Sequence, residues 1–200
     1  MPAGADPGSQ STRNQLPTTA NAQGRRNQLY KKLTAVQEGR VRNWVEEQFI
    51  HLDAEWIKRQ KPGARLTTLS AYVDMIMPVH SVILQIPPTP SSTSIRFQFF
   101  LRLTIDIFDR STMYHHSPDV ARSPSDEQHE ELLKLVDCFC LFDEGWVAIL
   151  SSQYWDIDKK KPLEYEPGTQ KNNSRTGLSE TEKSMLQSTL INGKAAVDDG

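Results

Sequence analysis

The chain has 200 residues, of which 37% are hydrophobic, and it carries a formal net charge of −2. This length and composition fit one ordinary domain with loose ends. The small net charge gives the chain as a whole no attraction to nucleic acid or anionic lipid, and no apolar run approaches the roughly 20 residues that span a bilayer.

Two cysteines, Cys138 and Cys140, are separated by one residue. A disulfide between such close neighbours would be strained, and a secreted chain of this size more often carries several disulfides. The first 20 residues also lack the apolar stretch of a secretory signal. We therefore expect an intracellular protein, in the nucleus or the cytoplasm, that does not enter a membrane.

Composition divides the chain into three parts. Residues 1–24 are rich in Gly, Pro, Ser, Thr, Asn and Gln, which predicts a disordered tail because so little apolar surface can be buried. Residues 158–200 are charged and interrupted by proline and glycine, which predicts a second disordered tail. Within this tail, the capping-box pattern of Ser179 and Glu182 predicts a short helix over residues 179–191. The folded domain is expected over residues 25–157.

Apolar residues at helical spacing predict a first helix over residues 27–60, with a bend near Gly39 where the stripe shifts by one step. Lys61-Pro62-Gly63 is expected to end it. A second helix begins after an N-cap at Thr67 or Thr68 and stops before Pro87. Pro78 lies inside this second pattern and is expected to kink or divide the helix.

Residues 95–108 fit two structures. Every odd position from Ile95 to Ile107 is apolar, which is typical of a strand. Gln98, Arg102, Asp106 and Arg110 step by four, which is typical of a polar stripe on a buried helix. Because an isolated two-stranded hairpin is marginal in water, we favour the helix. The alternative is a hairpin over residues 79–108, which would make the fold α+β.

The last helix is predicted to begin near Ser125, with Gly145 as an interruption and Cys140 in the core. Helical faces as apolar as these must pack on one another. We therefore predict a mostly α fold, a small antiparallel bundle of three to four helices between two disordered tails.

No motif in the sequence predicts catalysis, a cofactor or a metal. His115-His116 lacks further ligands at zinc spacing, and Cys138 and Cys140 lack the C-x-x-C spacing of zinc and redox sites. No nucleophile lies in a G-x-S-x-G setting, and no glycine pattern is suited to phosphate. We expect a protein that is not an enzyme.

The predicted function is a non-catalytic helical interaction module, a subunit or adaptor of a larger intracellular assembly, with other protein subunits as partners. Polar, disordered ends suggest a eukaryotic protein. Trp44 is expected in the core, whereas Trp56 and Trp155, near helix ends, are candidate partner-binding anchors. Arg40 and Arg42 form a candidate basic patch. The alternative is a nucleic-acid-associated factor that uses the basic segment 25–42.

Overall fold

The computed structural model describes residues 32–115, 126–163 and 178–198, and these are mostly helical, as expected. Five helices and one pair of short strands lie within these residues. Their bounds are α2 Ala35–Lys58, α3 Leu69–Gln85, α4 Thr93–His115, α5 Asp126–Leu150, β1 Trp155–Asp156, β2 Lys161–Pro162 and α6 Glu180–Asp198.

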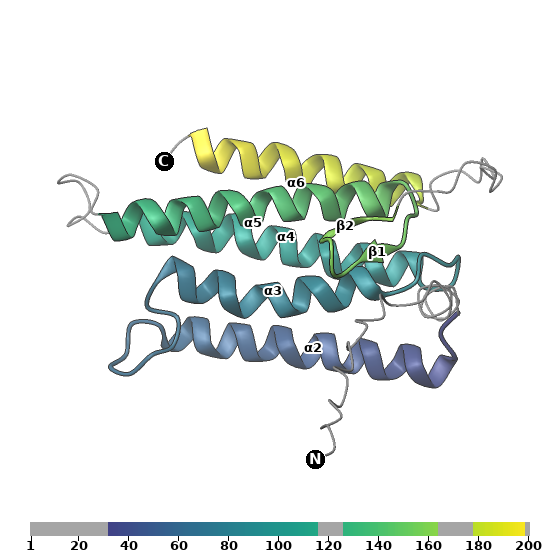
Figure 1. Cartoon of the computed structure of the whole chain (residues 1–200), viewed down its shortest axis with the longest axis horizontal. Coiled ribbons are helices and arrows are strands. Elements are labelled where there is room, and N and C mark those ends of the chain that lie inside the picture. The colour runs from purple at the N-terminus through teal and green to yellow at the C-terminus, as the bar shows by residue number, and fades with distance from the viewer. Residues whose placement is uncertain (1–31, 116–125, 164–177, 199–200) are drawn as a thin grey trace, which may run out of the picture. The chain divides into compact units, whose positions relative to one another are not determined.

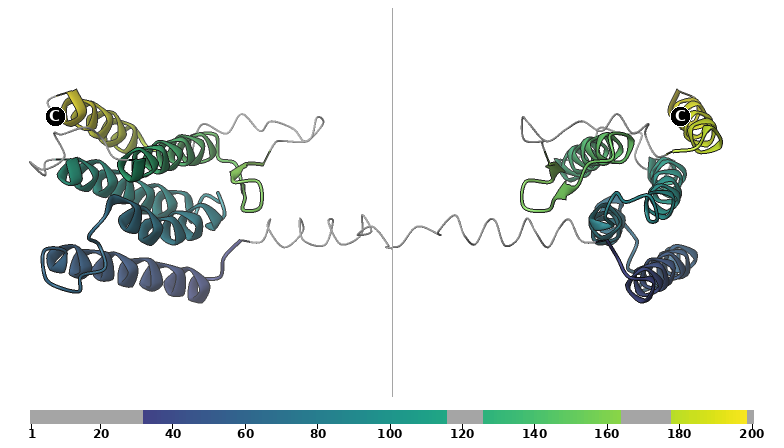
Figure 2. Two further views of the ribbon diagram at one scale, coloured as in Figure 1. Left: turned by 60° about the vertical axis from the view of Figure 1, so that its left-hand side comes forward. Right: turned by 90° about the vertical axis from the view of Figure 1, so that its right-hand side faces the viewer.

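The helices α2 to α5 run alternately up and down, each antiparallel to the one before it (Figure 1). Helix α3 packs against α2, α4 and α5, and α4 also packs against α5. The additional helix α6 lies along α4, which the end-on view in Figure 2 shows clearly. The predicted antiparallel bundle is therefore confirmed, and α6 adds one helix to the expected three or four.

Residues 95–108 are helical throughout, so the alternative hairpin over residues 79–108 is wrong. The apolar residues at odd positions resembled a strand pattern because α4 is buried on most of its circumference. Phe97 and Phe99 are both buried, although they lie about 200° apart around the helix. The polar stripe with a step of four was the informative pattern.

The N-caps of α2 and α3 follow from the sequence. Thr34 has an extended backbone and forms a capping box with Gln37, so α2 begins at Ala35 rather than in the expected stretch around residue 27. The side chain of Thr68 accepts a hydrogen bond from the Ala71 N–H and caps α3. Helix α2 continues through Gly39 without interruption, and α3 continues through Pro78.

The chain after α5 contains more structure than expected for a tail at 158–200. Strands β1 and β2 pair antiparallel, and the Asp156 carboxylate accepts hydrogen bonds from the backbone of Asp158 and Lys159 in the turn between them. Helix α6 is longer than the predicted 179–191 and packs on α4, with Leu178 and Leu186 buried. The predicted tail over residues 1–24 lies outside the described residues.

The predicted capping box of α6 also joins the helix to the bundle. The Glu182 carboxylate accepts hydrogen bonds from the backbone N–H of Ser179 and, across the interface, from the Ser94 hydroxyl of α4 at 2.7 Å. Partial burial raises the pKa of Glu182, but these hydrogen bonds outweigh it and hold the pKa below its usual value. The carboxylate that caps α6 therefore also holds it against α4.

Candidate interaction surface

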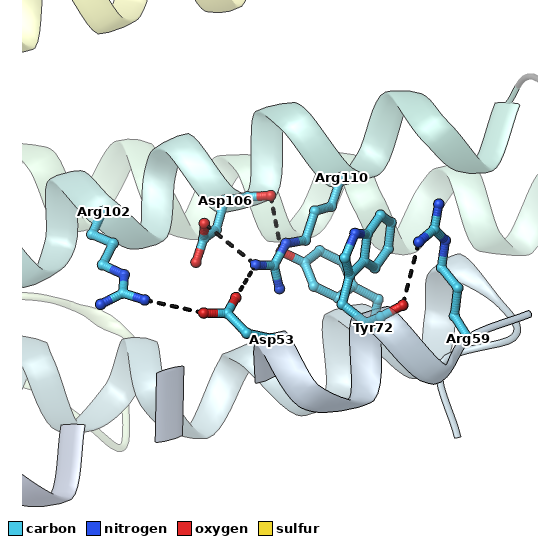
Figure 3. A network of polar contacts seen from close by, with 7 residues as sticks. Asp53, Arg59, Tyr72, Arg102, Asp106 and Arg110 are labelled. Carbon is cyan, nitrogen blue, oxygen red and sulfur yellow. Dashed lines mark hydrogen bonds and ion pairs between the residues drawn. The ribbon is translucent and has the colours of Figure 1, made fainter. Parts of the chain in front are cut away.

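The largest polar cluster joins α2 to α4. The Asp53 carboxylate of α2 binds Arg102 at 3.3 Å and also pairs closely with Arg110, both on α4. Arg110 lies between Asp53 and Asp106, with 3.7 Å to the Asp106 carboxylate (Figure 3). The Tyr72 hydroxyl of α3 donates to the Asp106 backbone carbonyl. These contacts tie three helices together.

The electrostatics of this cluster fit a structural role. Burial raises the pKa of Asp106, although Arg110 and Arg102 oppose that effect. Burial lowers the pKa of Arg110, but its carboxylate partners outweigh this and hold the pKa above its usual value. Each carboxylate faces a guanidinium, so the charges of the cluster pair with one another.

Trp56 lies beside this cluster and is half-buried. Its ring centroid is 5.9 Å from that of Tyr72 and 5.6 Å from that of Tyr114, and the Arg59 guanidinium covers its face at 3.9 Å. The ring therefore already has partners on its faces within the domain. The role of Trp56 as a partner-binding anchor stays a prediction, and only the part of its ring that is still exposed could contact a partner.

The other three candidate residues lie elsewhere. Trp155 is 4% exposed, its ring 5.9 Å from that of His80, so it belongs to the core of this structure. Arg40 is exposed, whereas Arg42 lies 3.9 Å from Glu38 on its own helix. About 24 Å of helix separates Arg40 from Trp56. The structure does not bring the four candidates together, and residues 25–31 of the basic segment lie outside the described part.

Trp44 is half-buried and packs against the core from its edge, rather than within it as expected.

Two buried groups in the core were not predicted from the sequence. His80 is 1% exposed, and its Nε2 donates to the Leu141 carbonyl at 3.2 Å. Burial lowers the pKa of His80 to about 4, which makes it neutral at pH 7. Arg96 donates to the Gln153 carbonyl at 2.8 Å, and burial lowers its pKa to about 10. His80 therefore links α3 to the middle of α5, and Arg96 links α4 to the loop after α5.

The two cysteines have exchanged the expected roles. Cys138 is buried with its sulfur 3.7 Å from the Met77 sulfur, whereas Cys140, expected in the core, is exposed. Burial raises the pKa of Cys138 to about 12, which keeps its thiol protonated and unreactive. Among the described residues no group of His, Cys, Asp or Glu could hold a metal ion. His116 lies outside that part of the chain, as does the His115 side chain.

A groove of about 480 Å³ runs between α3 and α5, beside Pro78 and Cys138. Its charged groups largely neutralise one another, since Lys134 binds the Asp74 carboxylate at 2.7 Å. The same lysine donates to the Ser70 hydroxyl at 2.7 Å. The Lys134 ammonium is therefore shared between a carboxylate and a hydroxyl.

The outward face of α5 exposes aliphatic side chains, as does α2 at Val36, Ile50 and Ile57, which are 65% to 74% exposed. With about 100° per residue, Leu133, Val136, Cys140 and Val147 fall within an arc of about 60°. We call these four residues the α5 stripe. Its aliphatic side chains are 50% to 55% exposed, and Cys140 is also exposed. Asp143 borders the α5 stripe on one side and Asp137 and Glu144 on the other. A continuous apolar line of this kind is typical of a binding surface.

The α5 stripe was missed because α5 is apolar on more than one side. The buried side consists of Leu135, Cys138, Phe142 and Trp146. In the sequence alone, the α5 stripe is an equally apolar face of the same helix. The signal was available: a helix needs one apolar face to pack, and α5 has two.

Comparison of the chain with models of protein families, with curated proteins and with solved structures finds no match. No helix in the described parts of the chain is long and apolar enough to cross a membrane.

Proposed function

We propose that the protein is a non-catalytic helical interaction module, a subunit or adaptor of a larger intracellular assembly, and that the α5 stripe is its principal contact surface. The observation that carries this proposal is the exposure of three aliphatic side chains on one line of a helix whose opposite side is buried in the core. Soluble domains seldom expose such a line unless something covers it.

The buried ionisable groups support the same proposal. His80 and Cys138 sit in the core with pKa values that keep them neutral, and Asp53 and Asp106 face arginines. An active site needs such groups beside a cavity, where they can reach a substrate. Cys138 does line the groove between α3 and α5, but its raised pKa keeps the thiol protonated. His80, Asp53 and Asp106 instead hold helices together.

The test is an affinity capture from cell extract with three full-length baits: the native chain, Val136→Asp and Ile50→Asp. Both substitutions place a carboxylate at an exposed aliphatic position in the middle of a helix, so neither is expected to unfold the domain. Loss of a stoichiometric partner with Val136→Asp, and its retention with Ile50→Asp, would support the proposal. Equal recovery by all three baits would show that α5 is not the contact surface.

A further inference from the structure

The charge around the α5 stripe is mostly negative. Five acidic residues of α5 with described side chains form no ion pair with a cation in the described residues: Glu130, Glu131, Asp137, Asp143 and Glu144. Glu46 and Glu47 of α2 also form no ion pair among these residues, but they do not border such an apolar line. The lysine of α5, Lys134, binds Asp74 of α3, and it lines the groove on that side together with Asp137 and Lys160. The apolar line therefore lies in a field that is negative at Asp143 and Glu144.

The shape of the α5 stripe limits what can cover it. The stripe runs from Leu133 to Val147, which is about 21 Å along the helix axis. Carboxylates border it on both sides in its C-terminal half, and Leu132, 42% exposed, widens it beside Val136. Such a narrow apolar surface suits a single partner element. A partner helix with apolar residues at positions i, i+3 and i+7 would follow such a line.

The charge decides among the candidate occupants. Two copies of this chain meeting through α5 about a two-fold axis would bring carboxylates against carboxylates, which is unfavourable. Anionic lipid and nucleic acid are repelled for the same reason. A helix with lysine or arginine beside its apolar line would instead place cations against Asp137, Asp143 and Glu144.

We propose that the α5 stripe binds a basic amphipathic helix of a partner protein. This inference rests on the proposed function and specifies the chemistry of its partner. The apolar line supplies most of the binding free energy, and the bordering carboxylates select a basic helix over an acidic one and set its orientation. Because the charge pairs lie at an exposed rim, binding weakens as salt screens them.

The test uses two synthetic helical peptides of about 18 residues, long enough to cover the stripe. Both carry leucine at the same spacing, and lysine flanks the leucines in one whereas glutamate flanks them in the other. Fluorescence anisotropy measures their binding to the full chain. We expect saturable binding of the lysine peptide and no saturable binding of the glutamate peptide. Equal binding of both peptides, or of neither, would overturn the inference.

Variants locate the binding. Val136→Asp should weaken the lysine peptide about tenfold or more, and Ile50→Asp should leave it unchanged. The triple variant Asp137→Lys, Asp143→Lys, Glu144→Lys should reverse the preference and bind the glutamate peptide better, a result that simple unfolding cannot produce. An unchanged peptide preference in the triple variant would show that these carboxylates do not select the partner.

The outcomes also separate this inference from the proposed function. If the partner captured from extract depends on Val136 but the lysine peptide does not bind, the interaction surface stands and the basic helix is wrong. If neither depends on Val136, both proposals fail.

Discussion

Gly145 lets α5 approach α4 closely. A Cβ atom placed there would lie 2.5 Å from the Phe100 ring, which is fully buried among Phe142, Trp146 and His80. The ring cannot turn aside without displacing its neighbours. The interruption that the sequence suggested at Gly145 is absent, because this glycine serves packing rather than a break in the helix.

We expect Gly145→Ala to destabilise the domain. Overpacking lowers the free energy of unfolding by about 1–3 kcal/mol, and the better helix propensity of alanine offsets about 1 kcal/mol of this loss. Gly39→Ala is the matched control, since Gly39 lies in the second turn of α2 and a Cβ there meets nothing within 4 Å. It should stabilise the domain by about 0.5–1 kcal/mol. Urea unfolding measures both, and an unchanged or higher midpoint for Gly145→Ala would show that Phe100 can move.

His80 should make stability depend on pH. Its pKa is lowered from 6.5 to about 4 in the folded state, chiefly by burial. Between these values the unfolded chain binds a proton that the folded chain does not, so stability falls as pH decreases below about 6.5. We expect a loss of about 2–3 kcal/mol between pH 7 and pH 4.5 from this group.

His80→Phe removes that titration while it keeps an aromatic ring between Phe100, Phe142 and Trp155. Urea unfolding at several pH values should give a flatter dependence for the variant than for the native chain. The difference between the two proteins isolates His80, because all other groups titrate in both. Parallel pH dependences would mean that folding does not lower the pKa of His80.

Sequence patterns predict a residue's role only where the physics is local. The caps Thr68 and Ser179 were found because a hydroxyl or carboxylate within three residues decides them. The sequence predicted Cys140 in the core, but Cys138 is the buried cysteine. The side of α5 that faces inward depends on its packing against α3 and α4, not on neighbouring residues. Gly145 gave no signal of its contact with Phe100, 45 positions away.

Among the helices, α4 and α6 differ in what the sequence could predict about them. The helical state of residues 95–108 was predicted from the step of four in its polar residues and from the marginal stability of an isolated hairpin, because burial of most of α4 erased the apolar periodicity. The start of α6 was correctly placed by its capping box. That α6 packs on α4 could not be predicted, because the Ser94–Glu182 contact joins residues 88 positions apart.

We expect α6 to open independently of the bundle. Among the described helices, its main contact is with α4, and Leu186 is buried there whereas Leu190 is 48% exposed. Leu186→Ala should weaken docking by at least about 2 kcal/mol, which is about 30-fold in the opening equilibrium. Hydrogen exchange should accelerate in α6 and stay slow in α3, and Leu190→Ala should change little. Equal acceleration in α3 would show that α6 unfolds only together with the bundle.

For the whole molecule, charge separates the two functional hypotheses. The net charge of −2 and the uncompensated carboxylates of α5 oppose binding to polyanions. Of the basic segment 25–42, the described cations are Lys32, Arg40 and Arg42, and Arg42 lies near Glu38. We expect no saturable binding of a labelled single-stranded RNA or duplex DNA at physiological ionic strength, and no effect of Arg40→Glu, Arg42→Glu on the protein partner.

Affinity that falls steeply with salt and disappears in this double variant would instead support the nucleic-acid hypothesis, because each lost phosphate contact removes counterion release. The α5 stripe and the carboxylates that border it would then lie away from the nucleic acid and could still bind a protein.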